Sequence, residues 1–97
     1  MKNEHQIYLI SDSTGETIDR IFAALKAQFS NFEYELNHFS FTRTENQIQK
    51  ILGNAKKKEN PIILYTIVNS KLAKYLSDES TKKQIPCFGV LGDLILN

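Results

Sequence analysis

The stretch IYLISDSTGET, residues 7–17, decides the fold that this sequence predicts. Residues 7–10 form a continuous apolar run, which is typical of a strand buried on both faces of a parallel sheet. Small polar residues and Gly15 then interrupt the run and predict a turn. Beyond the turn, apolar residues recur at spacings of three and four, as on a helix that packs against a sheet. These residues are Ile18, Ile21, Phe22, Leu25 and Phe29.

Strand and helix patterns continue to alternate along the chain. Residues 32–37 alternate between apolar and polar side chains, which predicts a half-exposed strand at an edge of the sheet. From Thr44 the apolar residues have the spacing of an amphipathic helix that ends either near Gly53 and Asn54 or in the lysine run 56–58, and Thr44 with Gln47 has the spacing of a capping box. Residues 62–68 are the most apolar stretch and are rich in β-branched side chains, so they predict a central strand.

A third helix and a fourth strand follow. Asn69 or Ser70 is expected to cap a helix with Leu72, Tyr75 and Leu76 on its inward face. The polar segment 78–84 then leads to a last strand over residues 85–91.

Short connections between alternating strands and helices require right-handed crossovers. The predicted fold class is therefore α/β, a Rossmann-like parallel sheet of order 2-1-3-4 with helices on both faces. In such a sheet, ligands bind at the carboxyl ends of strands 1 and 3, where the strand order reverses.

The length, the charge balance and the number of cysteines limit which partners and which cellular compartment we expect. The 97 residues suffice for one domain, 1–97, and twelve basic residues against eleven acidic ones give no reason to expect nucleic acid or an anionic membrane as a partner. Cys87 is the only cysteine, so an internal disulfide and a cysteine-rich metal site are excluded. The first apolar run is too short for a signal peptide or a membrane span. We therefore expect a cytoplasmic protein that holds no metal.

The turn after the first strand is the main candidate site. Its small residues, its glycine and the start of a helix are suited to bind an oxyanion through backbone N–H groups. The phosphate-binding candidates are Ser11, Asp12, Ser13, Thr14, Gly15 and Thr17. A competing interpretation needs no ligand, because Ser13 and Glu16 have the spacing of a capping box that would satisfy the helix by itself. Both interpretations stay open at this stage.

Two further residues are secondary candidates at the same edge. Arg43 follows the second strand, where its guanidinium would suit a phosphate, although a solvated loop arginine is the alternative. Asp93 follows the fourth strand, where a carboxylate is more often a turn or cap residue than a ligand. His38 is in phase with the apolar side of its strand, so a hydrogen-bonded, half-buried histidine is expected. The chain has no P-loop, dinucleotide-binding or zinc-protease motif and no paired nucleophile and base.

The sequence resembles the amino-terminal part of the regulatory proteins of pyruvate, phosphate dikinase and phosphoenolpyruvate synthase. The resemblance rests on YLISDSTGET at residues 8–17, AQF at 27–29 and PIILYTIV at 61–68, and it extends in collinear order to GDL at 92–94. It implies a bifunctional cytosolic enzyme that transfers phosphate from ADP to a threonine of its target enzyme and removes that phosphate with inorganic phosphate, which yields pyrophosphate.

The resemblance also limits what these residues are expected to do. Members of that family carry their P-loop in a carboxyl-terminal half, and this sequence ends before it. We therefore expect no catalytic residue and no firmly bound cofactor in residues 1–97, with ADP and phosphate implied for the whole enzyme. The resemblance implies one of the two target enzymes as the partner.

Two other classes of function remain as alternatives. Flavodoxins hold the flavin phosphate with a Thr-x-Thr-Gly-x-Thr type of turn, which residues 11–17 approach, so an FMN-binding domain is one alternative. A non-catalytic module that docks the target or forms a homodimer is the other, since the apolar residues 94–96 or the last strand would offer a surface for it.

Overall fold

The computed structural model of the chain describes residues 5–29 and 33–90. Within these ranges it contains four parallel strands and three α-helices. In chain order the elements are β1 (His5–Ser11), α1 (Glu16–Leu25), the 3₁₀ helix η1 (Lys26–Phe29), β2 (Tyr34–Phe39), α2 (Glu45–Lys56), β3 (Pro61–Thr66), α3 (Ser70–Lys82) and β4 (Cys87–Gly89).

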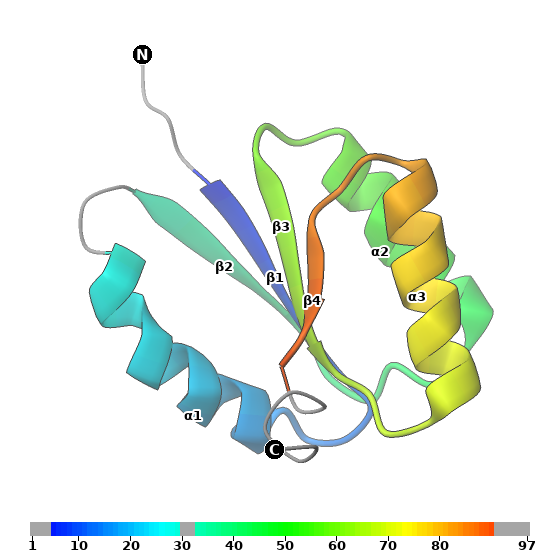
Figure 1. Ribbon diagram of the computed structural model, residues 1–97, viewed down its shortest axis with the longest axis horizontal. Helices are drawn as coiled ribbons and strands as arrows, with labels where there is room; N and C mark the ends of the chain where they lie inside the picture. Colours follow the sequence, from blue (N-terminus) through cyan, green and yellow to red (C-terminus); the bar gives the residue numbers. More distant parts are fainter. Residues whose placement is uncertain (1–4, 30–32, 91–97) are drawn as a thin grey trace.

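The sheet has the order β2-β1-β3-β4, and every strand pair is parallel, as the sequence predicts (Figure 1). The apolar run becomes an interior strand, because β1 pairs with β2 on one side and with β3 on the other. Its four residues from Ile7 to Ile10 are at most 1% exposed. Removing each such side chain from water contributes about 1.5–3 kcal/mol, so this strand anchors the core.

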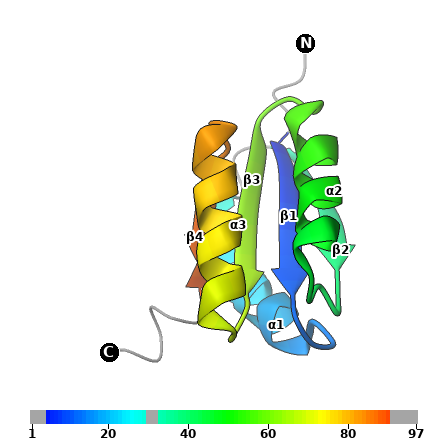
Figure 2. The same ribbon diagram turned by 90° about the vertical axis from the view of Figure 1, so that its right-hand side faces the viewer.

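Helices cover both faces of the sheet (Figures 1 and 2). Side chains alternate along β1, so Tyr8 and Ile10 join the cluster under α2 and α3, whereas Ile7 and Leu9 join the cluster under α1. The prediction of helices on both faces is therefore confirmed, with one helix on one face and two on the other.

Two of the predicted helix starts are confirmed in detail. The Thr44 side chain accepts a hydrogen bond from the Gln47 backbone N–H at 3.1 Å, and the Gln47 side chain accepts one from the Thr44 N–H at 3.0 Å, which closes the capping box of α2. Asn69 caps α3, because its Oδ1 accepts a hydrogen bond from the Leu72 N–H at 2.9 Å.

The third helix is longer than predicted. The segment 78–84 was expected to leave the helix, but α3 continues to Lys82. Ion pairs at helical spacing explain the extension: Lys74 pairs with Asp78 at 2.9 Å, and Glu79 pairs with both Lys82 and Lys83. Polarity alone had suggested a loop, although charges at these spacings favour a helix.

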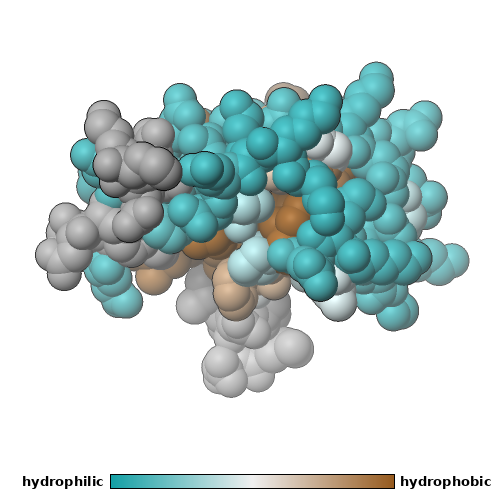
Figure 3. Space-filling view, turned by 90° about the horizontal axis from the view of Figure 1, so that it is seen from above, coloured by the Kyte–Doolittle hydropathy of each residue, from teal (hydrophilic) through white to brown (hydrophobic). Residues whose placement is uncertain are grey.

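Strand lengths also differ from the prediction. β3 ends at Thr66, two residues before the predicted end, and Val68 is 76% exposed. Among the described residues β4 covers only Cys87–Gly89, and residue 91 of the predicted strand lies outside them. Seen from above, most of the surface on the side of α2 and α3 is hydrophilic, with hydrophobic atoms visible between the polar ones (Figure 3). No helix in the described ranges is long and apolar enough to cross a membrane.

Candidate functional site

The turn between β1 and α1 lies at the carboxyl edge of the sheet, where the first residues of the turn are fixed by the neighbouring strand. The Asp12 N–H donates to the Thr66 carbonyl oxygen at 3.4 Å, and Asp12 Oδ2 accepts from the Val68 N–H at 2.8 Å. Asp12 therefore joins the end of β1 to the end of β3. Ser11 is 2% exposed, and its Oγ accepts from the Ser13 N–H at 3.1 Å. The hydrogen bonds of Ser11 and Asp12 thus fix the backbone at the start of the turn.

Of the two interpretations of this turn, the one that predicts a capping box between Ser13 and Glu16 is wrong. The N-cap of α1 is Gly15, in the left-handed conformation with φ 93°, and no side chain caps this helix. The helix consequently begins two residues too late for Ser13 to be its cap. The Ser13 Oγ instead lies 3.3 Å from the Ser11 Oγ, and the Glu16 N–H has only a long 3.4 Å contact to Thr14 Oγ1.

Several donors at the start of α1 therefore have no internal acceptor. The backbone N–H groups of Thr14, Gly15, Thr17 and Ile18 make no hydrogen bond to another residue in the ranges 5–29 and 33–90. The side chains of Thr14 and Thr17 are exposed beside them. Open N–H groups at a helix start carry partial positive charge and attract anions. The turn thus has the donors that an oxyanion needs.

Arg43 lies against this turn. Its Nε donates to the Asp12 carbonyl oxygen at 2.9 Å, and its guanidinium carbon lies 5.2 Å from the centre of the Phe41 ring. Within the described part of the chain, its two terminal nitrogens have no hydrogen-bond or ion-pair partner. The side chain is therefore held on the turn through one nitrogen, and its two remaining nitrogens can still donate to an anion.

The loop after β2 supports the turn through contacts that the sequence did not reveal. The Phe41 N–H donates to the Ser13 carbonyl oxygen at 2.9 Å, and the Ser40 hydroxyl donates to the Thr14 carbonyl oxygen at 2.9 Å. A Cβ on Gly15 would lie 3.2 Å from the Ser40 Oγ, so the loop also packs closely on the glycine. No residue pattern marks Ser40 and Phe41 in advance, because these contacts depend on β1 and β2 being neighbours.

The charges at the site do not all favour an anion. Glu16 and Asp19 lie in the first turn of α1, where their carboxylates interact well with the helix dipole but repel a phosphate. Both of them are exposed, so water and salt weaken that repulsion. Asp93, the other secondary candidate, lies outside the described residues. No group of three or more potential metal ligands occurs within the described ranges.

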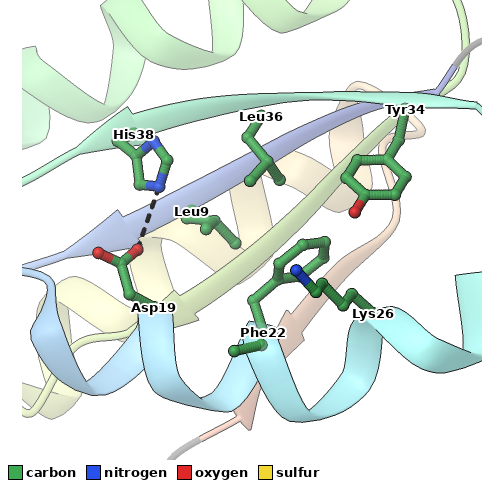
Figure 4. Close-up of a pocket in the computed structure, with 8 residues that line it drawn as sticks. Leu9, Asp19, Phe22, Lys26, Tyr34, Leu36 and His38 are labelled. Atoms are coloured by element: carbon green, nitrogen blue, oxygen red, sulfur yellow. Dashed lines mark ion pairs between the residues drawn. The ribbon is translucent and has the colours of Figure 1, made fainter.

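A separate hollow of about 250 Å³ lies between α1 and β2 (Figure 4). Leu9, Phe22 and Leu36 form its apolar floor. At one end His38 Nε2 lies 3.1 Å from Asp19 Oδ1, so the histidine has the polar partner that was expected, with half of its side chain exposed. The volume is below the range of about 300–1,000 Å³ typical of ligand sites, and the hollow suits a group no larger than a side chain.

Cys87 lies in surroundings that disfavour a thiolate. Its thiol lies against the core under α2 and α3, and burial raises the pKa of the thiol above its ordinary value. The raised pKa keeps the sulfur protonated near neutral pH, whereas nucleophilic and metal-binding cysteines act as thiolates.

The amino-acid sequence was compared with those of known proteins, and several of them are similar to it. The chain is 61% identical over 97 residues to a protein of Pelagibacter ubique named "Putative pyruvate, phosphate dikinase regulatory protein". Proteins with the same name from Alkaliphilus metalliredigens and Geotalea uraniireducens are 35% and 36% identical over 96 and 90 residues. The matches cover 100%, 98% and 93% of this chain but only 35%, 34% and 33% of those proteins. The chain thus spans about a third of the length of the curated relatives it matches.

The family profile described as kinase/pyrophosphorylase matches residues 7–97, which is nearly the whole chain. These matches do not favour a flavodoxin-like FMN domain or a separate docking module. They agree with the resemblance carried by the turn and the two interior strands. The chain belongs to the kinase/pyrophosphorylase family.

Proposed function

We propose that this chain is the amino-terminal part of a cytoplasmic regulatory enzyme that acts on pyruvate, phosphate dikinase or phosphoenolpyruvate synthase. In one direction the enzyme would transfer the terminal phosphoryl group of ADP to the hydroxyl oxygen of a threonine of the target, which breaks the bond between the two phosphates and releases AMP. In the other it would transfer that group from the threonine to inorganic phosphate, which yields pyrophosphate. The role of this chain would be to bind phosphate at the β1–α1 turn.

One observation carries the proposal: the turn that contains the open N–H groups also holds Arg43, whose Nε donates to the Asp12 carbonyl oxygen of the same turn. Phosphoryl transfer needs fixed donors and cations around the phosphate oxygens more than it needs covalent chemistry from the protein. The four N–H groups would supply fixed donors without a charge of their own. Arg43 would supply the charge, and its planar head matches two phosphate oxygens.

The described residues are suited to bind phosphate rather than to transfer it. The described part of the chain offers no activated nucleophile with a base, and the Cys87 thiol stays protonated. The target threonine would itself be the nucleophile in the forward reaction, so this chain need not supply one. The residues that activate that threonine and hold ADP would lie in the remaining two thirds of an enzyme of the relatives' length.

A titration followed by amide NMR tests the proposal. Phosphate, pyrophosphate and ADP are added separately to the isotope-labelled chain, and the amide signals of Thr14, Gly15, Thr17 and Ile18 are expected to shift most. In Arg43→Ala we expect phosphate binding to weaken by about 10- to 150-fold, because a charge-assisted hydrogen bond contributes about 1.5–3 kcal/mol.

Arg20 provides the matched control. It is the other arginine of the chain and lies exposed on α1, so Arg20→Ala removes the same charge from another position and should leave the affinity within about twofold. Equal weakening in the two variants would mean that only net charge matters. Silent amides in the turn would refute binding there.

A further inference from the structure

The near-neutral composition conceals a separation of charge between two parts of the molecule. Residues 45–83, which contain α2 and α3, carry eight lysines and four carboxylates. Residues 5–44, which contain β1, α1 and β2, carry three basic side chains and five carboxylates. The excess positive charge therefore belongs to the layer that α2 and α3 form on one face of the sheet.

Five of the eight lysines gather where these two helices end. We call them the lysine cluster: Lys56, Lys57, Lys58, Lys82 and Lys83. Lys57 and Lys83 are the C-cap residues of α2 and α3. The two helix ends are joined directly, because Lys56 Nζ donates to the Lys83 carbonyl oxygen at 3.2 Å. The cluster thus combines segments that are far apart in the sequence, and both helices end at the same side of the fold (Figure 1).

The lysine cluster contains more positive charges than the dipoles of the two helices require. One or two cations near each helix end complement the helix dipole. Here Glu79 pairs with Lys82 and Lys83, but in the ranges that the structure describes no carboxylate pairs with Lys56, Lys57 or Lys58. All three side chains are exposed. Glu59, next to Lys58 in the sequence, and Glu79 are the carboxylates of these segments, so the five lysines outnumber them and the cluster keeps an excess of positive charge.

We propose that the lysine cluster is a docking surface for an acidic segment of a partner protein. A row of carboxylates would neutralise the positive charge that Glu59 and Glu79 leave in excess, and exposed lysines chiefly raise the rate of encounter with such a segment. The surface would act from a position away from the β1–α1 turn, since the turn lies at the carboxyl ends of the strands and the cluster lies near their starts (Figures 1 and 2). The inference does not depend on phosphate binding.

Two observations favour a protein over nucleic acid or a membrane. The whole chain has a formal net charge of +1 and a pI near 7.8, whereas nucleic-acid-binding domains usually carry a larger basic excess. Stacking on bases or insertion into lipid needs exposed aromatic or aliphatic residues beside the cations. The exposed large apolar residues within the described ranges are Phe41, Val68 and Phe88, and none of them belongs to the segments that carry the cluster.

The test uses a fluorescent peptide of ten glutamates as the probe and the full 97-residue chain as the receptor. Anisotropy titrations at low and high salt measure its affinity. In the variant Lys57→Gln/Lys58→Gln we expect the affinity at low salt to fall by about 2- to 30-fold, from two exposed ion pairs. Amide NMR of the parent chain should show shifts confined to residues 56–60 and 82–85.

A matched variant, Lys71→Gln/Lys74→Gln, removes two exposed lysines from the opposite end of α3 and should leave the affinity nearly unchanged. Loss of affinity confined to the cluster variant, with the localised shifts, supports the proposal. An equal loss in both variants, no binding of the peptide, or tighter binding of a ten-nucleotide single-stranded DNA would each overturn it. Circular dichroism of both variants shows whether they remain folded.

Discussion

The helices α1 and α2 both begin at the carboxyl edge of the sheet, yet their first turns are completed in opposite ways. Each start offers a hydroxyl residue followed three positions later by Glu or Gln: Ser13 with Glu16, and Thr44 with Gln47. At α2 the pair closes into a capping box. At α1 it does not, and Gly15 takes the N-cap position without any side-chain hydrogen bond.

The backbone before each helix accounts for the difference. Thr44 is extended, with φ −128° and ψ 156°, which directs its side chain to the N–H of the third helical residue. Gly15 has φ 93° and ψ 1°, so the chain turns once more before the helix starts. The two helices use the same residue types, but at α2 the side chains of Thr44 and Gln47 accept from two backbone N–H groups, whereas no side chain caps α1. An open helix start is what a phosphate site requires, and a closed one stabilises the fold.

Replacing Gly15 with alanine should have the largest effect on this contrast. The left-handed conformation is strained for residues other than glycine, and the new Cβ would lie 3.2 Å from the Ser40 Oγ. We expect Gly15→Ala to lower the free energy of unfolding by about 1–3 kcal/mol, measured by urea denaturation. The same variant should weaken phosphate binding, because the turn must change its course.

Gly53 is the matched control for that substitution. It lies inside α2, and a Cβ there would meet nothing within 4 Å. Gly53→Ala should therefore raise the free energy of unfolding by about 0.5–1 kcal/mol through helix propensity. Similar losses in both variants would contradict the special role of the Gly15 conformation.

Replacing Thr44 or Ser13, the hydroxyl residues that begin the two matching patterns, should change the stability less than replacing Gly15. Thr44→Ala removes a cap that is in use and should cost about 0.5–2 kcal/mol of stability. Ser13→Ala removes an exposed side chain that caps nothing, and its effect should stay within about 0.5 kcal/mol. Thermal unfolding of the two variants under identical conditions measures the difference. If Ser13→Ala were the more damaging change, the helix start would be closed in solution.

The sequence predicted the parts of the molecule that depend on local pattern. The strand order, both helix-bearing faces and the caps at Thr44 and Asn69 follow from periodicity, crossover handedness and cap spacing. The α1 start was ambiguous because the spacing of Ser13 and Glu16 fits a capping box whatever Gly15 does between them. Only backbone dihedral angles distinguish the two outcomes, and a sequence pattern does not contain them.

The sequence predicted which residues meet at this edge of the sheet, but not the tertiary contacts among them. Arg43 was a candidate because parallel strands bring their carboxyl ends together, and the structure holds it on Asp12. The supporting roles of Ser40 and Val68 were not predictable, since each is a single hydrogen bond across neighbouring strands. The role of Asp12 as the link between β1 and β3 was missed for the same reason.

The smallest predicted effect concerns the carboxylate of Glu79. Unlike the carboxylates in the first turn of α1, it accepts hydrogen bonds from three side chains. Hydrogen bonds from Gln49, Lys82 and Lys83 lower the pKa of Glu79 to about 2. Because the folded pKa lies below the ordinary carboxyl value, the resulting stability is complete above that value and is lost as the pH falls through the range from about 5 to about 2.

Urea midpoints measured across that range should therefore decline less steeply in Glu79→Gln than in the parent chain. Gln49→Ala removes the hydrogen bond with the largest influence on this pKa and should reproduce part of the flattening, with the carboxylate still present. A parent slope retained in Glu79→Gln would assign the acid sensitivity to other carboxylates. A flattened slope would show that the charge of Glu79, which accepts from Gln49 of α2 and pairs with Lys82 and Lys83 at the end of α3, helps to hold the two helices together.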